Sequence, residues 1–424
     1  MHYHPAQITQ LVDHLFRHES GKMVSVLSRL LGLQNLETAQ DIVQDVLLQA
    51  MSTWPYNGVP DNAAGWLYRV AKNKAIDFLR REKKFKKLSP EYTYLLESEY
   101  SLSPTVNNLF LENEVKDSQL RMMFACSHPS IPEESQIALT LKTLCGLTAY
   151  EIAKAFLTTE ETVSKRIYRA KEKIRTEKIE LVVPEGHELS DRLDAVLKAL
   201  YLLFNEGYNS SHPDQLIRED LCEEAMRLVY LLTQHNITNL SRTNALLSLM
   251  CFQSSRLQAR LDDKGNIILL KYQDRKKWFQ PLMQKGFFYL DLATENFDFS
   301  PYHLEAAIAS LHASAESFEN TNWRSIYQLY EILYRLEPSP IVALNKAIAS
   351  AYANDKESAL EQLQKIKGLE NYYIYYTSIG EIYFELHNYE SAKKYYETAL
   401  SLTSSRSEQQ LLLTKINNCF PVNN

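Results

Sequence analysis

The chain contains 424 residues with a formal net charge of −6, and 45% of its residues are hydrophobic. Domains cluster near ~100 to 150 residues, so roughly two to four domains are expected. No stretch approaches the ~18 to 20 uninterrupted apolar residues of a membrane helix. Met1–Arg17 lacks the basic start, apolar run and cleavage site of a secretion signal. These features argue against a membrane-spanning or secreted class, and we expect a cytoplasmic protein that engages no membrane.

The cysteines give no sign of a disulfide framework or a metal site. They are odd in number, widely spaced and never form a C-x-x-C pair: Cys126, Cys145, Cys222, Cys251 and Cys419. Zinc sites and disulfide scaffolds both require closer or paired spacing. We expect reduced, mostly buried thiols and no bound cofactor.

Composition predicts an all-helical fold with an uneven charge. Only 11 glycines and 14 prolines punctuate the chain, and apolar residues recur mainly at spacings of three and four. Residues 1–180 hold 23 basic against 22 acidic residues, whereas the remainder holds 23 against 30, which gives net charges of +1 and −7. Within the first part, Arg69–Lys87 and Lys165–Lys178 are basic and Leu88–Ser135 is acidic. Two basic modules joined by an acidic segment are therefore predicted.

The first amphipathic helix is predicted over Leu36–Trp54. One side of it is apolar and suited to a core: Val43, Leu47, Ala50 and Trp54. Glu37, Asp41 and Asp45 line the opposite side, where no Lys or Arg of the helix offsets their mutual repulsion. Leu48 adds an apolar tip among these acids. Such a face suits docking on a basic partner surface; a solvated acidic face with one stray leucine would give the same pattern.

A second helix is predicted over Gly65–Lys84. Its buried side comprises Leu67, Tyr68, Ala71, Ala75, Phe78 and Leu79. The other side gathers cationic, amide and aromatic groups, continued by a basic run: Trp66, Arg69, Asn73, Asp77, Arg80, Arg81, Lys83, Lys84, Lys86 and Lys87. Cations follow phosphates, flat side chains stack on bases and an amide reads a base edge, which indicates single-stranded nucleic acid. The alternatives are a solvated helix end with favourable cations, and a Trp66 packed on the loop Pro55–Ala64.

A helix-turn-helix is predicted over Glu134–Lys178. Thr148 and Glu151 form a capping box that starts a short helix. Thr158 and Glu161 form a second box that starts the next helix, after a turn of a few residues.

The second helix of this motif has two distinct faces. Apolar residues face inward: Val163, Ile167, Ala170 and Ile174. Polar and basic residues face outward: Thr162, Lys165, Arg166, Arg169 and Lys173. A recognition helix has this layout, with its first residues in the major groove and its later cations on phosphates. Arg166 or Lys165 could pair with guanine and Thr162 with a thymine methyl, whereas the alternative is a plain helical hairpin.

These segments together resemble bacterial sigma factors of the extracytoplasmic-function type. Asp41–Asp45, with the letters DIVQD, resembles sigma region 2.2. Gly65–Asn73 followed by Ala75–Arg81 resembles regions 2.3 and 2.4, and Leu147–Arg175 resembles region 4.2. The order and spacing agree with the family, although Asp45 stands where the family more often has Glu. The resemblance implies an RNA polymerase specificity subunit whose partners are core polymerase and promoter DNA.

The resemblance also implies a role for each surface. The partners on core polymerase would be the β′ clamp helices and the β subunit. The residues that would dock on the clamp helices are Asp41, Gln44, Asp45 and Leu48. The loop Tyr56–Ala64 and Asn73 would capture an extruded base of the −10 element, and the melted strand would be held by Trp66, Arg69, Arg80 and Arg81. The −35 element would be read as duplex by Thr162, Lys165, Arg166, Arg169 and Lys173.

Five segments are expected from this reading. They are region 2 over 1–87, an acidic linker over 88–133, region 4 over 134–182, a helical extension over 183–320 and tetratricopeptide-like repeats over 321–424. The linker would thread through the polymerase cleft or serve as a disordered spacer.

The C-terminal half carries a repeat pattern. The positions of a tetratricopeptide repeat are occupied by Tyr376, Ile379, Gly380, Tyr383, Ala392, Tyr396 and Ala399. A weaker copy covers Asn345–Ala359, Trp323–Pro338 fits the second helix of another unit, and Asp262–Asn266 predicts a small hairpin. Asp191–Thr233 and Gln273–Arg275 resemble a sigma-factor subgroup with a repeat-bearing extension. We expect the repeats to stack and to regulate through polymerase, DNA or a regulatory protein.

Other classes explain less of the sequence. An enzyme is not expected, because no phosphate loop, H-E-x-x-H or G-x-S-x-G motif is present. A helix-turn-helix regulator that binds operators alone would leave the acidic helix and the Trp66 face unused. A pure repeat scaffold would leave both basic modules without a role.

Overall fold

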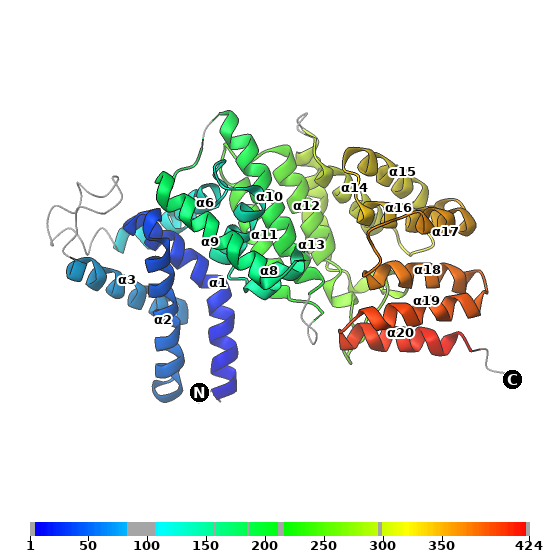
Figure 1. Cartoon of the computed structure of the whole chain (residues 1–424), viewed down its shortest axis with the longest axis horizontal. Coiled ribbons are helices and arrows are strands. Elements are labelled where there is room, and N and C mark those ends of the chain that lie inside the picture. The colour runs from blue at the N-terminus through cyan, green and yellow to red at the C-terminus, as the bar shows by residue number, and fades with distance from the viewer. Residues whose placement is uncertain are drawn as a thin grey trace. The chain divides into compact units, whose positions relative to one another are not determined.

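The computed structural model describes most of the chain: residues 5–82, 107–156, 158–184, 186–210, 216–295 and 299–420. This part consists of α-helices, short 3₁₀ turns and loops (Figure 1), which confirms the predicted all-α fold. The described residues contain one isolated antiparallel bridge, Leu261 with Ile267, and no longer strand. None of the described helices combines the length and the apolar character needed to cross a membrane.

The chain folds into two compact units. Unit 1 comprises Met1–Glu206 and Asp220–Thr238, and unit 2 comprises Gly207–Glu219 and Asn239–Asn424. The division does not coincide with the predicted start of the extension at residue 183, because the first helices beyond it fold with the N-terminal ones.

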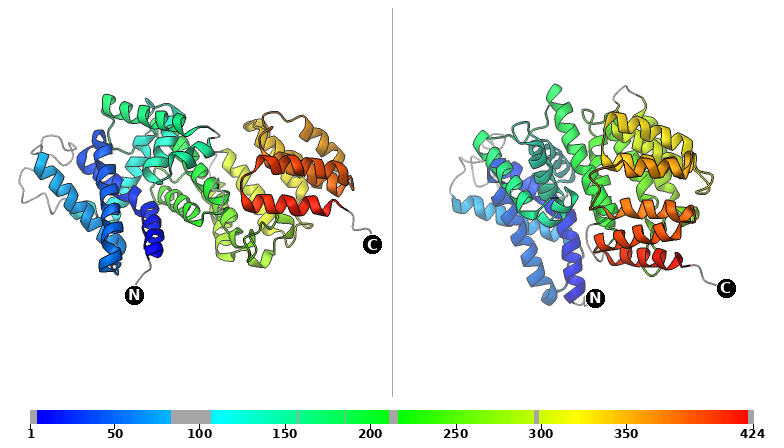
Figure 2. Two further views of the ribbon diagram at one scale, coloured as in Figure 1. Left: turned by 60° about the horizontal axis from the view of Figure 1, so that its bottom comes forward. Right: turned by 45° about the vertical axis from the view of Figure 1, so that its right-hand side comes forward.

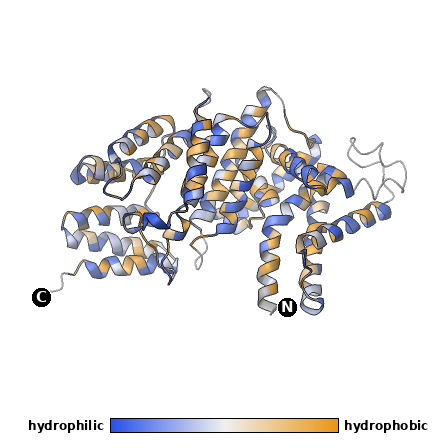
Figure 3. Cartoon of the chain, turned by 180° about the vertical axis from the view of Figure 1, so that it is seen from behind, coloured by the Kyte–Doolittle hydropathy of each residue, from blue (hydrophilic) through white to orange (hydrophobic). Residues whose placement is uncertain are grey.

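Unit 1 is a bundle of amphipathic helices. They are α1 (Pro5–Leu31), η1 (Leu33–Asn35), α2 (Leu36–Asn57), α3 (Ala63–Glu82), α6 (Glu112–Cys126), α7 (Glu133–Leu144), α8 (Ala149–Ala155), α9 (Glu160–Glu177), nearly all of α10 (His187–Tyr208) and of α11 (Glu219–Thr233). Figure 3 shows the apolar stripes along the helices. The long α1 packs against α2, α6 and α7, so it joins the predicted region 2 and the helix-turn-helix in one core.

Part of the predicted acidic linker is a packed helix. Helix α6 buries Val115, Leu120 and Phe124, and its acids face Arg29 of α1. Arg29 Nη1 lies 2.8 Å from a Glu114 oxygen and 2.9 Å from an Asp117 oxygen. A disordered spacer is therefore excluded for α6. The many acids of this segment concealed its apolar face. Residues 88–106 of the predicted linker lie outside the described residues.

Unit 2 is a succession of paired helices. They are α12 (Ser241–Ser254), η3 (Leu257–Ala259), η4 (Leu270–Tyr272), η5 (Arg275–Lys277), α13 (Gln280–Ala293), α14 (Pro301–Ser314), α15 (Trp323–Leu336), α16 (Pro340–Ala353), α17 (Lys356–Gln364), α18 (Tyr373–Glu385), α19 (Tyr389–Leu402) and α20 (Arg406–Asn418). Both views of Figure 2 show the orange-to-red helices α18–α20 side by side.

Helices α18 and α19 pack closely against each other. A side chain at Gly380 would place its Cβ 2.7 Å from the ring of Tyr396, so only glycine lets the two helices approach this closely. Ala392 and Ala399 are fully buried at the same interface. Asn388 caps α19 by accepting from Ser391 N at 3.1 Å, which fixes the turn between the helices.

The predicted hairpin at Asp262–Asn266 is a tight turn. Asp262 Oδ1 accepts from Asn266 N at 2.8 Å and from Lys264 N at 2.9 Å, and Gly265 takes a positive φ of 79°. The bridge between Leu261 and Ile267 closes it.

Candidate nucleic-acid interface

The acidic face of α2 points away from the unit 1 core. Asp41, Gln44 and Asp45 are exposed, and Leu48 is 54% exposed among them. The opposite side is buried as predicted: Val43, Leu47, Ala50 and Trp54. The cation nearest this face comes from the next helix, since Lys74 Nζ lies 3.4 Å from Asp45 Oδ2. An exposed leucine ringed by acids is consistent with a docking surface for a basic partner.

Helix α3 presents most of its predicted nucleic-acid face to solvent. Arg69, Asn73, Arg80 and Arg81 are exposed. Trp66 differs from the prediction, because its ring is half-buried and meets the buried Trp54 ring edge-on at 5.5 Å between centroids. The large indole extends sideways from its helix to α2, which the helical wheel does not represent. The basic run from Lys83 to Lys87 lies outside the described residues.

A groove of about 440 Å³ separates α2 from α3. Its polar lining includes Asp45, Asn73 and Arg81, with Lys74 and Asp77 between them. The structure therefore brings together residues predicted for polymerase docking and residues predicted for the −10 element. Near the end of α2, Tyr56 is 89% exposed and leaves a flat ring free to stack on a base.

The first helix cap predicted for the helix-turn-helix is confirmed, whereas the second cap lies one residue later than predicted. Thr148 Oγ1 accepts from Glu151 N at 3.2 Å, and Glu151 accepts from Thr148 N at 2.7 Å, so this capping box is complete. Helix α9, however, is capped by Thr159, whose Oγ1 accepts from Thr162 N at 3.3 Å. The box predicted at Thr158 is thus wrong by one residue, because two adjacent threonines offer equivalent caps.

The outward face of α9 carries cations that mostly pair with acids of unit 1. Lys165 Nζ lies 2.7 Å from Glu161, and Lys173 Nζ lies 2.7 Å from Glu177. Arg166 is half-buried, pairs with Glu134 of α7 and lies over the ring of Phe156. Arg169 is exposed and has no ion pair among the described residues. Thr162 is half-buried beside the cap.

Charge pairs between distant segments connect region 2 to the helix-turn-helix, and the sequence did not reveal them. Lys171 Nζ of α9 lies 2.8 Å from Gln40 Oε1 and 3.6 Å from Glu37 Oε1 of α2. Arg17 of α1 lies 3.6 Å from Glu151 of α8. Gln40 and Lys171 are 131 positions apart, and no local pattern marks such a contact.

A buried charge pair joins α11 to the same bundle. Glu224 is 2% exposed and accepts from Arg227 Nε at 2.8 Å and Nη2 at 2.7 Å. Arg227 Nη1 also donates to Gln119 of α6 at 3.2 Å. Burial alone would raise the pKa of Glu224, but hydrogen bonds from Arg227 and His18 together hold it below its ordinary value. The carboxylate is therefore ionised inside the bundle.

Known proteins resemble this chain in the same segments. The model of Sigma-70 region 2 matches residues 15–85, that of Sigma-70 region 4 matches 121–174, and a family of unknown function, DUF6596, matches 192–294. The extracytoplasmic-function sigma factor SigW of Bacillus subtilis is 25% identical over 163 residues, covering 36% of this chain and 81% of that protein. An uncharacterized protein of Rhizobium meliloti is 34% identical over 378 residues, 88% of each chain.

The chain thus carries Sigma-70 regions 2 and 4, and this part of it is similar to extracytoplasmic-function sigma factors. Sigma factors as a family are non-catalytic transcription initiation factors. The extracytoplasmic-function sigma-E factor of Haemophilus influenzae is 29% identical over 157 residues, covering 36% of this chain and 79% of that protein. No solved structure matches the chain.

The family matches locate the sigma segments on the helices. The region 2 match contains α2 and α3, and the region 4 match begins within α6 and contains α7 and α8. The match to the family of unknown function runs from within α10 to the end of α13.

Proposed function

We propose that this sigma factor binds core RNA polymerase, recognises −35 and −10 promoter elements and initiates transcription in the cytoplasm, under the control of its C-terminal repeats. The observation that carries the proposal is the exposed acidic face of α2 beside the cationic face of α3, in a chain where both sigma segments occur in order.

The acidic face would dock on the β′ clamp helices. Asp41, Gln44 and Asp45 would meet basic groups there, and Leu48 would enter an apolar pocket. Burying one leucine side chain contributes ~1.5 to 3 kcal/mol, whereas the exposed charges mainly set orientation and association rate. Leu48 is thus the anchor of the docking surface.

The −10 element would be held along α3. Asn73 lies in the groove between α2 and α3, where its amide can read the edge of an extruded base. Arg69, Arg80 and Arg81 are exposed and would follow the phosphates of the melted strand. Trp66, whose half-buried ring packs on Trp54, would contribute only the exposed part of that ring.

The −35 element would be read by α9. Arg169 is available for phosphate, and Lys165 and Lys173 would exchange their exposed acidic partners for phosphates at small cost. Arg166 would have to leave Glu134 to reach a guanine, which makes duplex binding compete with a contact inside region 4. Thr162 at the helix start would touch a thymine methyl.

Promoter recognition would require unit 1 to open. The −35 and −10 elements lie about 25 base pairs apart, ~85 Å of duplex at about 3.4 Å per step. In the structure α9, only ~27 Å long, touches the start of α2 through Lys171. Polymerase would separate the two modules, because exposed pairs such as Lys171 with Glu37 contribute only ~1 kcal/mol or less.

Run-off transcription tests the function. The purified chain is added to sigma-free core polymerase with a library of genomic fragments, and transcript starts are sequenced. We expect discrete starts that share −35 and −10 sequences and are absent with core alone. Tight binding of the chain to duplex operators without polymerase, and no new starts, would contradict the proposal and favour a conventional helix-turn-helix regulator.

A further inference from the structure

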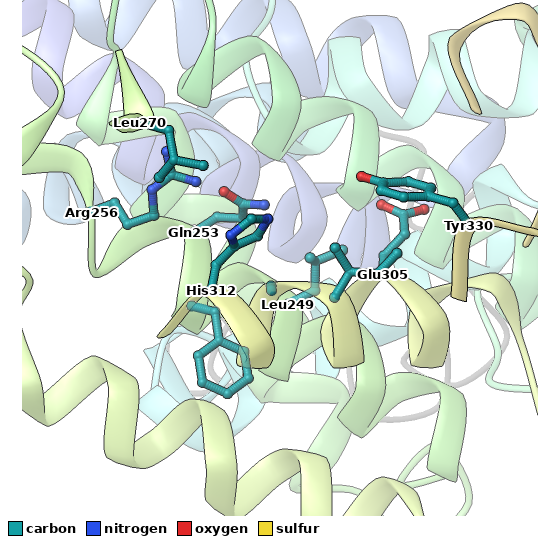
Figure 4. Close-up of a pocket in the computed structure, with 10 residues that line it drawn as sticks. Leu249, Gln253, Arg256, Leu270, Glu305, His312 and Tyr330 are labelled. Atoms are coloured by element: carbon teal, nitrogen blue, oxygen red, sulfur yellow. The ribbon is translucent and has the colours of Figure 1, made fainter. Parts of the chain in front are cut away.

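Unit 2 contains a cavity of about 230 Å³ enclosed by α12, α14, α15 and η4. Leu249, Phe252 and Ile308 line its apolar part. Figure 4 shows two polar ends, with Arg256, Gln253 and His312 gathered at one and Glu305 with Tyr330 at the other. At ~30 Å³ per water, the volume corresponds to about eight waters and suits a ligand of about eight non-hydrogen atoms.

The first end concentrates positive charge that forms no ion pair within the described part of the chain, although the charge of Glu319 acts on Arg275. Arg256 lies over the ring of Trp278 at 5.1 Å, and Arg275 lies over the same ring at 4.1 Å. Arg256 Nε donates to Gln273 Oε1 at 3.3 Å, and Arg275 Nη1 donates to the His312 carbonyl at 2.9 Å. Neither guanidinium forms an ion pair with any residue that the structure describes. Both arginines are half-buried, and an anion would offset the cost of their partial removal from water.

The titration behaviour of this end agrees with its geometry. Burial, followed by the charge of Arg256, lowers the pKa of Arg275 to about 10. Burial and both arginines lower the pKa of His312 to about 3, so its imidazole is neutral. A neutral imidazole can donate one hydrogen bond without adding a further charge.

Polar atoms at this end also lack partners. Gln253 Oε1 and His312 Nδ1 are buried and have no hydrogen-bond partner within the described part of the chain. Buried polar groups are normally satisfied, and an unsatisfied one costs ~1 to 3 kcal/mol. Two such atoms beside an unpaired guanidinium, all lining one cavity, indicate that a polar ligand completes the site.

The second end has the opposite character. Burial, followed by the negative charge of Glu305, raises the pKa of Tyr330, so a neutral phenol lies beside a carboxylate. A carboxylate and a hydroxyl suit an ammonium group, and they disfavour a ligand that is negatively charged throughout. The cavity thus has guanidinium and imidazole groups at one end, a carboxylate and a phenol at the other, and apolar side chains between.

We propose that this cavity binds a small zwitterion of the amino-acid class, with its carboxylate on Arg256, Gln253 and His312 and its amine at Glu305. The ligand would bridge α12, α14 and α15, and its binding would couple a metabolite to the first helix of the predicted repeats, α15. This inference stands apart from the proposed function, since binding can be measured without polymerase or DNA.

Calorimetry and thermal shift on the full chain test the proposal. The probes are the proteinogenic amino acids, one at a time, with succinate, inorganic phosphate and putrescine as controls that lack one of the two charges. We expect at least one amino acid to bind and to raise Tm by about 3 °C at saturating concentration, and to bind at least about tenfold more tightly than every control probe. Binding of phosphate or succinate alone, or of none of the probes, would overturn the proposal.

Variants locate the binding. Arg256→Met should weaken amino-acid binding by about tenfold or more, and Glu305→Gln should weaken it while leaving succinate binding unchanged or stronger. Arg335→Met, at an exposed arginine of α15, is the matched control and should bind as the native chain does. Circular dichroism verifies that each variant is folded, and the nearly isosteric Glu305→Gln keeps the test valid if Arg256→Met fails to fold. Equal affinity in all three folded variants would refute the assignment.

Discussion

Both units bury arginine side chains, but they neutralise them differently. In unit 1, Arg227 donates two hydrogen bonds to Glu224, and this carboxylate raises the pKa of the guanidinium despite its burial. In unit 2, Arg275 has no carboxylate partner among the described residues, and burial together with Arg256 lowers its pKa to about 10. In unit 1 the Glu224 carboxylate neutralises Arg227, which also donates to Gln119 of α6 and so connects two helices. In unit 2 the proposed ligand would supply the carboxylate that Arg256 and Arg275 lack. This difference separates an arginine that stabilises the fold from arginines that form a binding site.

The largest expected effect comes from breaking the complete pair. Arg227→Met leaves Glu224 buried without its partner, and should lower the free energy of unfolding of unit 1 by ~3 to 5 kcal/mol. Arg275→Met removes a guanidinium that has no ion pair among the described residues, but it also removes the hydrogen bond to the His312 carbonyl. These effects oppose each other, so the stability of unit 2 should change by less than ~1 kcal/mol in the absence of ligand. Hydrogen exchange in urea reports each unit separately. Equal losses of unfolding free energy in both variants would contradict the proposed difference between the two sites.

A second, smaller effect concerns the exposed face of α3. Asn73→Ala should slow promoter opening about 30-fold, because the lost amide contact is worth ~2 kcal/mol, while core binding stays unchanged. Potassium permanganate footprinting measures the opening, and Asn417→Ala on α20 is the matched control. Because Asn73 shares a groove with Asp45, a parallel loss of core binding would show that this groove serves docking instead.

The smallest effects separate the two kinds of cation on α9. Arg166→Ala should weaken −35 binding by ~1 to 2 kcal/mol at one base position and relax the preference there. Lys173→Ala should weaken binding to all sequences alike and reduce the salt slope by about one. Binding of holoenzyme to promoter variants across a salt series distinguishes the two, and identical behaviour of both variants would contradict the assignment of Arg166 to a base.

The periodicity of the sequence predicted those features that depend on residues close together along one helix. The buried side of α2 and the capping box at Thr148 both follow from local spacing. Features set by distant partners did not follow. No local pattern indicates that Trp66 rests on Trp54, or that the acidic segment contains the buried face of α6.

The cavity of unit 2 illustrates the same limit. Arg256, Glu305 and Tyr330 come from separate helices or their ends, and each alone resembles an ordinary surface residue. Only the fold brings them around one space. The repeat assignment for 321–424 remains a prediction, because the family matches end at residue 294.

Docking on core polymerase is the central claim, and one titration tests it most directly. The affinity of the chain for sigma-free core is compared between Leu48→Asp and Leu413→Asp, which alter exposed leucines of 54% and 44% accessibility on α2 and α20. We predict that Leu48→Asp weakens binding at least about 30-fold, ~2 kcal/mol, and that Leu413→Asp leaves it unchanged. Unchanged binding in Leu48→Asp, or no stable complex with the native chain, would contradict the account.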